Sequence, residues 1–189
     1  MNAMKGPIEK RTLSLLVDSE AGVLARVVGM FSARGYNIES LNVTEIDANE
    51  KLARITIVTK GSPMILEQIK AQLSRIITVY LVKDLTVDCQ SVERELAFVK
   101  IRGREATRNK SLEVAENFQA RPIDLKEKAI IFEIVGTSEK IDRFIEEMTP
   151  LGVIEIGRTG PLAMEEGPRT LSYEEERHIV LNNTDEVID

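Results

Sequence analysis

The chain has 189 residues, of which 43% are hydrophobic and none is tryptophan. This length suits two small folded units, and the hydrophobic content is too high for a disordered chain. Its single cysteine, Cys89, excludes an intrachain disulfide and a cysteine-rich zinc site. Its single histidine, His178, lies in a polar tail and argues against a Ser-His-Asp triad. We therefore predict no catalytic residue and no metal ligand in this chain.

The net charge of −6 lies almost entirely in the last 25 residues. Residues 165–189 carry two basic and eight acidic side chains, which leaves the body of the chain neutral. A neutral body argues against nucleic-acid binding, because contact with the phosphate backbone needs a positive face. The apolar runs are too short to span a bilayer, and the first residues lack the apolar core of a signal peptide. We expect a cytoplasmic protein with no membrane partner.

The first half alternates strands and helices in the order βαββαβ. A short apolar strand is followed by a segment with apolar residues at three- and four-residue spacings, which is typical of an amphipathic helix. Gly35 is expected to end that helix in the left-handed conformation, and Ser62-Pro63 to begin the second one. The expected strands are 12–17, 36–46, a third through 53–57, and 76–85, and the helices are 23–34 and one through 65–73.

The second half repeats the same order. The expected strands are 94–101, 122–125, 129–135 and 153–156, and the helices are 107–118 and one that Thr137-Ser138 caps. These patterns predict an α+β protein with two ferredoxin-like βαββαβ domains in tandem. The predicted division is an extension (1–10), a first domain (11–88), a second domain (89–164) and an acidic tail (165–189). One larger α+β domain is the alternative.

Each predicted sheet has both helices on one face. The opposite face, or an edge strand, would then be open to a partner. Strands of the first domain are apolar on much of both faces, so we expect side-by-side dimerisation through that domain.

The turn from Asp18 to Leu24 is the best candidate for a binding site. A helix N-terminus presents free N–H groups and a positive dipole end, which suit a carboxylate. The small residues Ala21 and Gly22 let a ligand approach that backbone closely. Asp18, Ser19 or Asn37 could accept hydrogen bonds from an ammonium group, so the turn could bind an amino acid. The alternative is structural, with Ser19 as a simple helix cap and Gly22 as a tight turn.

From about Arg11 to Glu165 the chain resembles the small, regulatory subunit of acetolactate (acetohydroxyacid) synthase. The matching stretches are Arg11–Val17, Gly22–Val27, Phe31–Leu41, Leu66–Ile69, Val92–Leu96 and Arg158–Gly160. The most specific run is Arg34-Gly35-Tyr36-Asn37-Ile38-Glu39-Ser40-Leu41.

The resemblance implies that the first domain is an ACT domain, which binds effectors and dimerises. In that family the catalytic (large) subunit holds thiamine diphosphate, Mg²⁺ and usually FAD, and the small subunit has no cofactor of its own. The catalytic subunit condenses two pyruvates, or pyruvate with 2-oxobutyrate, on the way to valine, leucine and isoleucine. The small subunit raises this activity and confers feedback inhibition, usually by valine. The implied partners are the catalytic subunit, a second copy of this chain and valine or a related amino acid.

The resemblance also implies where the effector binds, namely between two paired ACT domains. The residues that correspond are Ser19, Ala21, Gly22, Val23 and Leu24 of the turn, with Asn37 and Ile38 across the interface. Many members have asparagine where this chain has Ser19, so altered effector binding is an open alternative. A free-standing ACT-domain amino-acid sensor is the other functional alternative, although no helix-turn-helix pattern supports a role in transcription.

Overall fold

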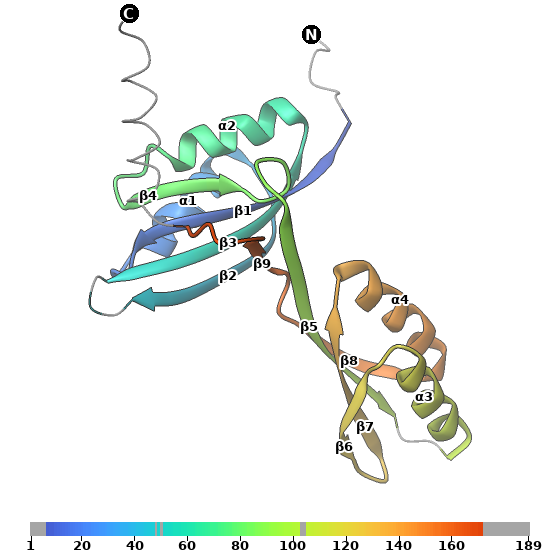
Figure 1. Cartoon of the computed structure of the whole chain (residues 1–189). Helices are drawn as coiled ribbons and strands as arrows, with labels where there is room; N and C mark the ends of the chain where they lie inside the picture. Colours follow the sequence, from blue (N-terminus) through green and yellow to red (C-terminus); the bar gives the residue numbers. More distant parts are fainter. Residues whose placement is uncertain (1–6, 48, 50, 103–104, 172–189) are drawn as a thin grey trace, which may run out of the picture. The chain divides into compact units, whose positions relative to one another are not determined.

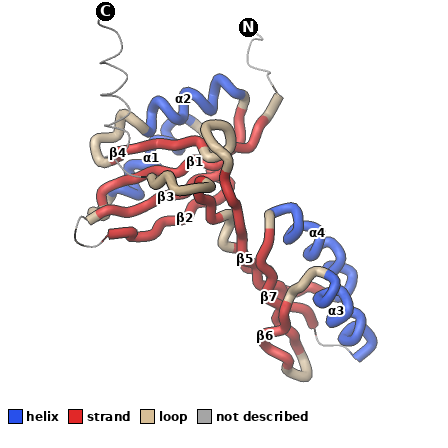
Figure 2. Tube along the Cα trace, viewed as in Figure 1, coloured by secondary structure: helices blue, strands red, loops and turns tan. Residues whose placement is uncertain are grey.

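The first part of the chain forms a four-stranded antiparallel sheet with two helices on one face (Figures 1 and 2). A computed structural model describes residues 7–47, 49, 51–102 and 105–171. The strand order across the sheet is β2-β3-β1-β4, and the predicted βαββαβ order is confirmed. The elements are β1 Glu9–Asp18, α1 Val23–Arg34, β2 Ile38–Asp47, β3 Leu52–Gly61, α2 Pro63–Leu73 and β4 Val79–Asp84.

The core of this unit lies between the sheet and its helices. Helix α1 buries Val23, Val27 and Phe31, which are spaced four residues apart as an amphipathic helix requires. Gly35 ends the helix with φ 68°, and the amide of Tyr36 donates to the carbonyl of Phe31 at 3.0 Å, as expected for a left-handed cap. The other side chains of this core come from alternate positions of β1 and β3, from one stripe of α2 and from the start of β4: Leu13, Leu15, Val17, Ala53, Ile55, Ile57, Leu66, Ile69, Leu73 and Val79.

The second part repeats the architecture, with strand order β6-β7-β5-β8 and both helices on one face (Figure 2). Three phenylalanines centre its core: the rings of Phe118 and Phe144 lie 5.5 Å apart, and Phe132 meets Phe144 edge-on. The predicted cap at Thr137 is confirmed, since its hydroxyl accepts a hydrogen bond from the amide of Lys140. The elements are β5 Ser91–Arg102, α3 Glu105–Asn117, β6 Arg121–Leu125, β7 Ala129–Gly136, α4 Ser138–Met148, the 3-10 turn Thr149–Leu151 and β8 Val153–Arg158.

Two local expectations differ from the structure. Strand β4 begins at Val79 rather than Ile76, because tight turns occupy the intervening residues: the amide of Val79 donates to the carbonyl of Ile76 at 2.9 Å. Ser62 stands at the N-cap of α2 ahead of Pro63, as predicted, but its hydroxyl makes no cap hydrogen bond. The oxygen is instead buried without a partner among the described residues.

A short strand, β9 (Leu162–Glu165), was not expected from the sequence. It pairs with β5, and the amide of Glu166 donates to the carbonyl of Gln90 at 2.9 Å. By its contacts the described chain divides into two units, one that ends at Val92 and resumes with residues 163–171, and one within Glu93–Leu162. The expected domains ended instead at residues 88 and 164, with everything from 165 in a separate tail. In the structure residues 163–171 belong to the first unit.

These residues 163–171, here called the returning segment, lie on the sheet face that the sequence left open. In Figure 1 the orange-red segment runs in front of β3, on the side away from α1 and α2. Ala163 is 1% exposed. On the sheet, the alternate residues that face away from the helices are also buried: Thr12, Ser14, Leu16, Thr56 and Val58. The chain itself therefore supplies a cover for this face.

Candidate functional site

The turn between β1 and α1 leaves the helix N-terminus without a side-chain cap. Gly22 is the N-cap residue, with φ 92°, and it makes no side-chain hydrogen bond. The first turn of α1 contains no acidic residue. The alternative that Ser19 caps this helix is therefore wrong, since α1 begins three residues too late for it. Uncapped amides and the positive end of the dipole are suited to an anionic group.

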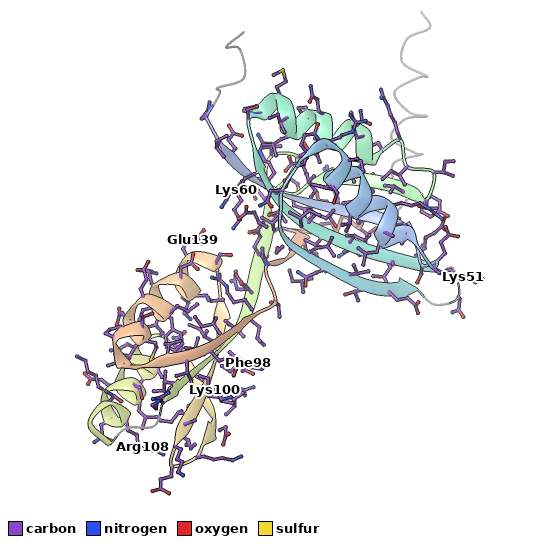
Figure 3. All side chains as sticks on the ribbon, turned by 180° about the vertical axis from the view of Figure 1, so that it is seen from behind. Lys51, Lys60, Phe98, Lys100, Arg108 and Glu139 are labelled. Atoms are coloured by element: carbon purple, nitrogen blue, oxygen red, sulfur yellow. The ribbon has the colours of Figure 1, made fainter. Side chains whose placement is uncertain are left out.

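Backbone and side-chain bonds fix the turn to neighbouring strands. The amide of Ser19 donates to the carbonyl of Lys51 at 2.6 Å, and its hydroxyl donates to a carboxylate oxygen of Glu45 at 2.9 Å. Lys51 lies at the end of the hairpin formed by β2 and β3 (Figure 3). On the other side, the hydroxyl of Tyr80 donates to the carboxylate of Asp18. The polar side chains that precede the helix thus have partners within the chain.

The surface of the turn is open to an approaching ligand. Ala21, Gly22 and Leu24 are exposed, whereas Val23 is buried in the core and anchors the first turn. A β-carbon placed at Gly22 would have no atom within 4 Å. The positive φ, rather than crowding, is therefore what favours glycine at this position.

Asn37 and Ile38 lie at the other end of α1. The 12 residues of the helix separate them from Gly22 by about 18 Å, at 1.5 Å per residue. Asn37 donates to Glu39 at 2.6 Å, and its carbonyl accepts from the hydroxyl of Thr59 at 2.7 Å. One copy of the chain therefore does not bring Asn37 to the turn, and a shared pocket needs a second copy.

No group of three or more His, Cys, Asp or Glu side chains within the described residues is placed to hold a metal ion. His178 lies outside the described residues. No helix in the described part is long and apolar enough to cross a membrane.

A second polar cluster, which sequence reasoning did not identify as a unit, lies in the second part of the chain. The guanidinium of Arg158 makes two bonds to the carboxylate of Glu95, at 2.6 and 2.9 Å, and one to Asp142 at 2.6 Å. Ser138 also donates to Glu95. Glu95 is 3% exposed. The cluster joins the Val92–Leu96 and Arg158–Gly160 stretches, which carry part of the family resemblance, across 63 positions.

The pKa directions in this cluster follow from its geometry. Burial alone would raise the pKa of Glu95, but hydrogen bonds from Arg158 and Ser138 outweigh it and lower the pKa below its usual value. The bonds from Glu95 in turn raise the pKa of Arg158. Both groups are therefore held in their charged forms, which is the arrangement of a structural ion pair.

The first unit has the βαββαβ fold and the glycine turn of an ACT domain, followed by a second unit of the same topology. Residues 13–81 match the family model described as "AHAS small subunit-like ACT domain", and residues 94–167 match "Small subunit of acetolactate synthase".

Similar proteins of known family cover most of the chain. It is 41% identical over 160 residues to a probable acetolactate synthase small subunit of Methanothermobacter thermautotrophicus, covering 84% of this chain and 94% of that protein. It is 38% identical to the acetolactate synthase small subunit of Mycolicibacterium smegmatis, covering 84% and 92%. The crystal structure of the small subunit from Thermotoga maritima superposes with a TM-score of 0.75 at 31% identity, covering 85% and 99%.

The chain belongs to the family of acetolactate synthase small subunits. This confirms the family expected from the sequence and the tandem fold with an N-terminal ACT domain. The small subunit of this enzyme is its non-catalytic, regulatory component.

Proposed function

We propose that this chain activates the catalytic subunit of acetolactate synthase and mediates its feedback inhibition by valine. The observation that carries the proposal is the uncapped N-terminus of α1 at Gly22, in a chain that belongs to this family. The carboxylate of the effector would lie against the first-turn amides, where the helix dipole favours negative charge. The turn residues Asp18, Ser19, Ala21, Gly22, Val23 and Leu24 would form one side of this site.

A homodimer would complete the site. Strand β2 is an edge of the sheet, and Val43 and Ile46 on it are exposed. The exposed side chains Leu24 and Val28 lie one turn apart on α1. Exposed apolar groups along an edge strand and a helix are suited to side-by-side pairing with a second copy. Such pairing would provide Asn37 and Ile38 from the partner protomer, which one chain cannot place beside its own turn.

The proposal is tested by reconstitution with the catalytic subunit of the same organism. The purified chain alone should form no acetolactate, but it should raise the rate of the catalytic subunit and make that rate sensitive to valine. Calorimetry with valine, leucine and isoleucine on the isolated chain identifies the preferred effector. A chain that neither bound nor stimulated the catalytic subunit at any ratio would refute the regulatory role.

The turn itself is tested by two substitutions at one position. Gly22→Ala and Gly22→Asp both place a side chain at a positive φ, so they share the backbone strain. Only aspartate adds a carboxylate, which would occupy the first-turn amides and repel the carboxylate of the effector. We expect Gly22→Asp to abolish valine inhibition while activation persists, and Gly22→Ala to retain a measurable part of the inhibition. Unchanged inhibition in Gly22→Asp would remove the turn from the site.

A further inference from the structure

A cavity lies between the returning segment and the sheet face opposite the helices. Its volume is about 190 Å³, enough for roughly six water molecules at about 30 Å³ each. Every residue around it belongs to the first unit. Three strands contribute neighbouring positions of this face, because Ser14 pairs with Lys83 and Leu16 with Arg54 in the antiparallel register. The residues around the cavity are Ser14, Arg54, Lys83, Leu85, Ala163, Met164, Glu165, Arg169, Thr170 and Leu171.

The charge around this cavity is predominantly positive. Three side chains, Arg54, Lys83 and Arg169, are cationic, and one, Glu165, is anionic. The ammonium of Lys83 forms an ion pair with Glu165, and both side chains are mostly buried. That pair fastens the returning segment to β4 and neutralises one cation. Within the described residues, Arg54 and Arg169 have no ion-pair partner of this kind.

Arg54 is the unusual member of this set. It lies on the central strand β3, with β1 and β2 on either side, and no carboxylate of the described residues lies within ion-pair distance of it. Its Nε is buried and has no hydrogen-bond partner within the described part of the chain. Loss of hydration lowers the pKa of this guanidinium, and no opposing charge offsets that effect.

A cation without a counter-charge at this position on β3 lowers the stability of the folded chain. Arg54 is half-buried, and its buried Nε donor loses the free energy of its hydration when it has no acceptor. Guanidinium groups bind carboxylates and phosphates through paired N–H donors. The position of Arg54 is therefore explained if the cavity holds an anion.

We propose that this cavity is a second ligand site, which binds a small oxyanion (a carboxylate or a phosphate) through Arg54, with Arg169 at the cavity surface. The site lies on the opposite face of the sheet from α1 and is separate from the effector turn. Its volume admits a small organic acid or inorganic phosphate. A bound anion would tie the returning segment to the sheet of the ACT domain.

The test measures the thermal stability of the full chain and its calorimetric response to defined anions. Inorganic phosphate and pyruvate are titrated separately against chloride at equal ionic strength, since these two probes distinguish the phosphate and carboxylate sources. We expect at least one of them to bind saturably and raise the melting temperature. Arg54→Gln should weaken this binding about tenfold or more, because it removes a charged donor. The matched control is Arg34→Gln on α1, whose guanidinium donates to Gln72 outside the cavity.

Arg169→Gln keeps the test decisive if Arg54→Gln folds poorly, since Arg169 is exposed and its replacement leaves the core intact. We expect this variant to fold normally and to bind the anion more weakly. Absence of a saturable response to both probes in the wild type would overturn the proposal. An affinity for the anion that equals that of the wild type in both cavity variants would also overturn it. Valine titrated into Arg54→Gln separates the two sites, because binding at the α1 turn should persist whether or not the cavity binds an anion.

Discussion

At the scale of single residues, Glu95 and Arg158 of the second unit form an ion pair with two hydrogen bonds. The carboxylate is 3% exposed and receives three side-chain hydrogen bonds. Ion pairs at the surface contribute little to stability, whereas removal of one partner from a buried pair leaves an uncompensated charge. An arginine that pairs with a buried carboxylate should therefore contribute more to stability than one that pairs at the surface, although the two substitutions look alike in the sequence.

Arg158→Gln is expected to destabilise the second unit by about 1–2 kcal/mol, because buried Glu95 would lose its guanidinium partner, although solvent screens the exposed side of Arg158. The control is Arg121→Gln, whose side chain is 73% exposed and bonds Glu133 in the same unit. Hydrogen exchange of the β5 and β7 amides measures the effect. A similar loss of amide protection in both variants would show that the burial of Glu95 does not determine how much the pair contributes to stability.

The same carboxylate predicts a pH dependence. Because the pKa of Glu95 is lower in the folded chain than its usual value of 4.5, the ionised form stabilises the fold. That contribution is complete above pH 4.5 and is lost as the pH falls towards the folded pKa. Glu95→Gln should therefore be less stable than the wild type at neutral pH, and its stability should fall less steeply below pH 4.5. Parallel acid-denaturation curves would contradict this assignment.

At the scale of elements, helix α1 and strand β2 have contrasting faces. The helix buries Val23, Val27 and Phe31 against its own sheet, but Leu24 and Val28 remain exposed. Strand β2 is paired on one side only. An apolar surface beside an unpaired strand edge is unfavourable in an isolated protomer. The proposed dimer would bury this surface and leave the core of each protomer unchanged.

Val28→Glu is expected to shift the chain from dimer to monomer, because it would bury a charge in the paired surface. The matched control is Ile77→Glu, which replaces a side chain that is 96% exposed on the turn before β4. Size-exclusion chromatography with light scattering distinguishes the two states. If both variants kept the oligomeric state of the wild type, α1 would not lie in the interface.

At the scale of the whole molecule, the returning segment joins the end of the described chain to the sheet of its first unit. Strand β9 alternates in exposure, with Ala163 1% and Met164 56% exposed, so one side of it faces the sheet. The face beneath it includes Leu16 and Val58, which are almost completely buried. Stability of the ACT domain therefore depends on residues that follow the second unit in the sequence.

Ala163→Lys is expected to destabilise the first unit by about 2 kcal/mol or more, since it would place an unpaired cation beside Arg54 and Lys83. Leu162→Lys adds the same charge one residue earlier on β9, at an exposed position outside the cavity, and should have little effect. Hydrogen exchange of the β1 and β3 amides provides the measurement. Protection that stayed equal in the two variants would mean that the segment does not stabilise the sheet.

Local patterns in the sequence were sufficient for most of the fold. Apolar spacing along α1 and the alternation of Ala53, Ile55 and Ile57 depend only on near neighbours, so they identify both the elements and their core faces. The end of α1 at Gly35 was predictable for the same reason, because a left-handed cap is a local conformation. The candidate turn was located for a similar reason. The alternative interpretation, with Ser19 as the cap of α1, is wrong, because a glycine with positive φ begins the helix.

By itself, the sequence determined the two βαββαβ units, the core face of each sheet and the family. Only the tertiary structure decided what packs on the opposite face of the first sheet, because periodicity orients a side chain without specifying its long-range neighbour. Arg54 illustrates the difference: alternation directs it away from the helices, and the returning segment, more than a hundred residues later, forms the other wall of the cavity in which its buried Nε lies. The contact between Glu95 and Arg158 likewise depends on a distant strand.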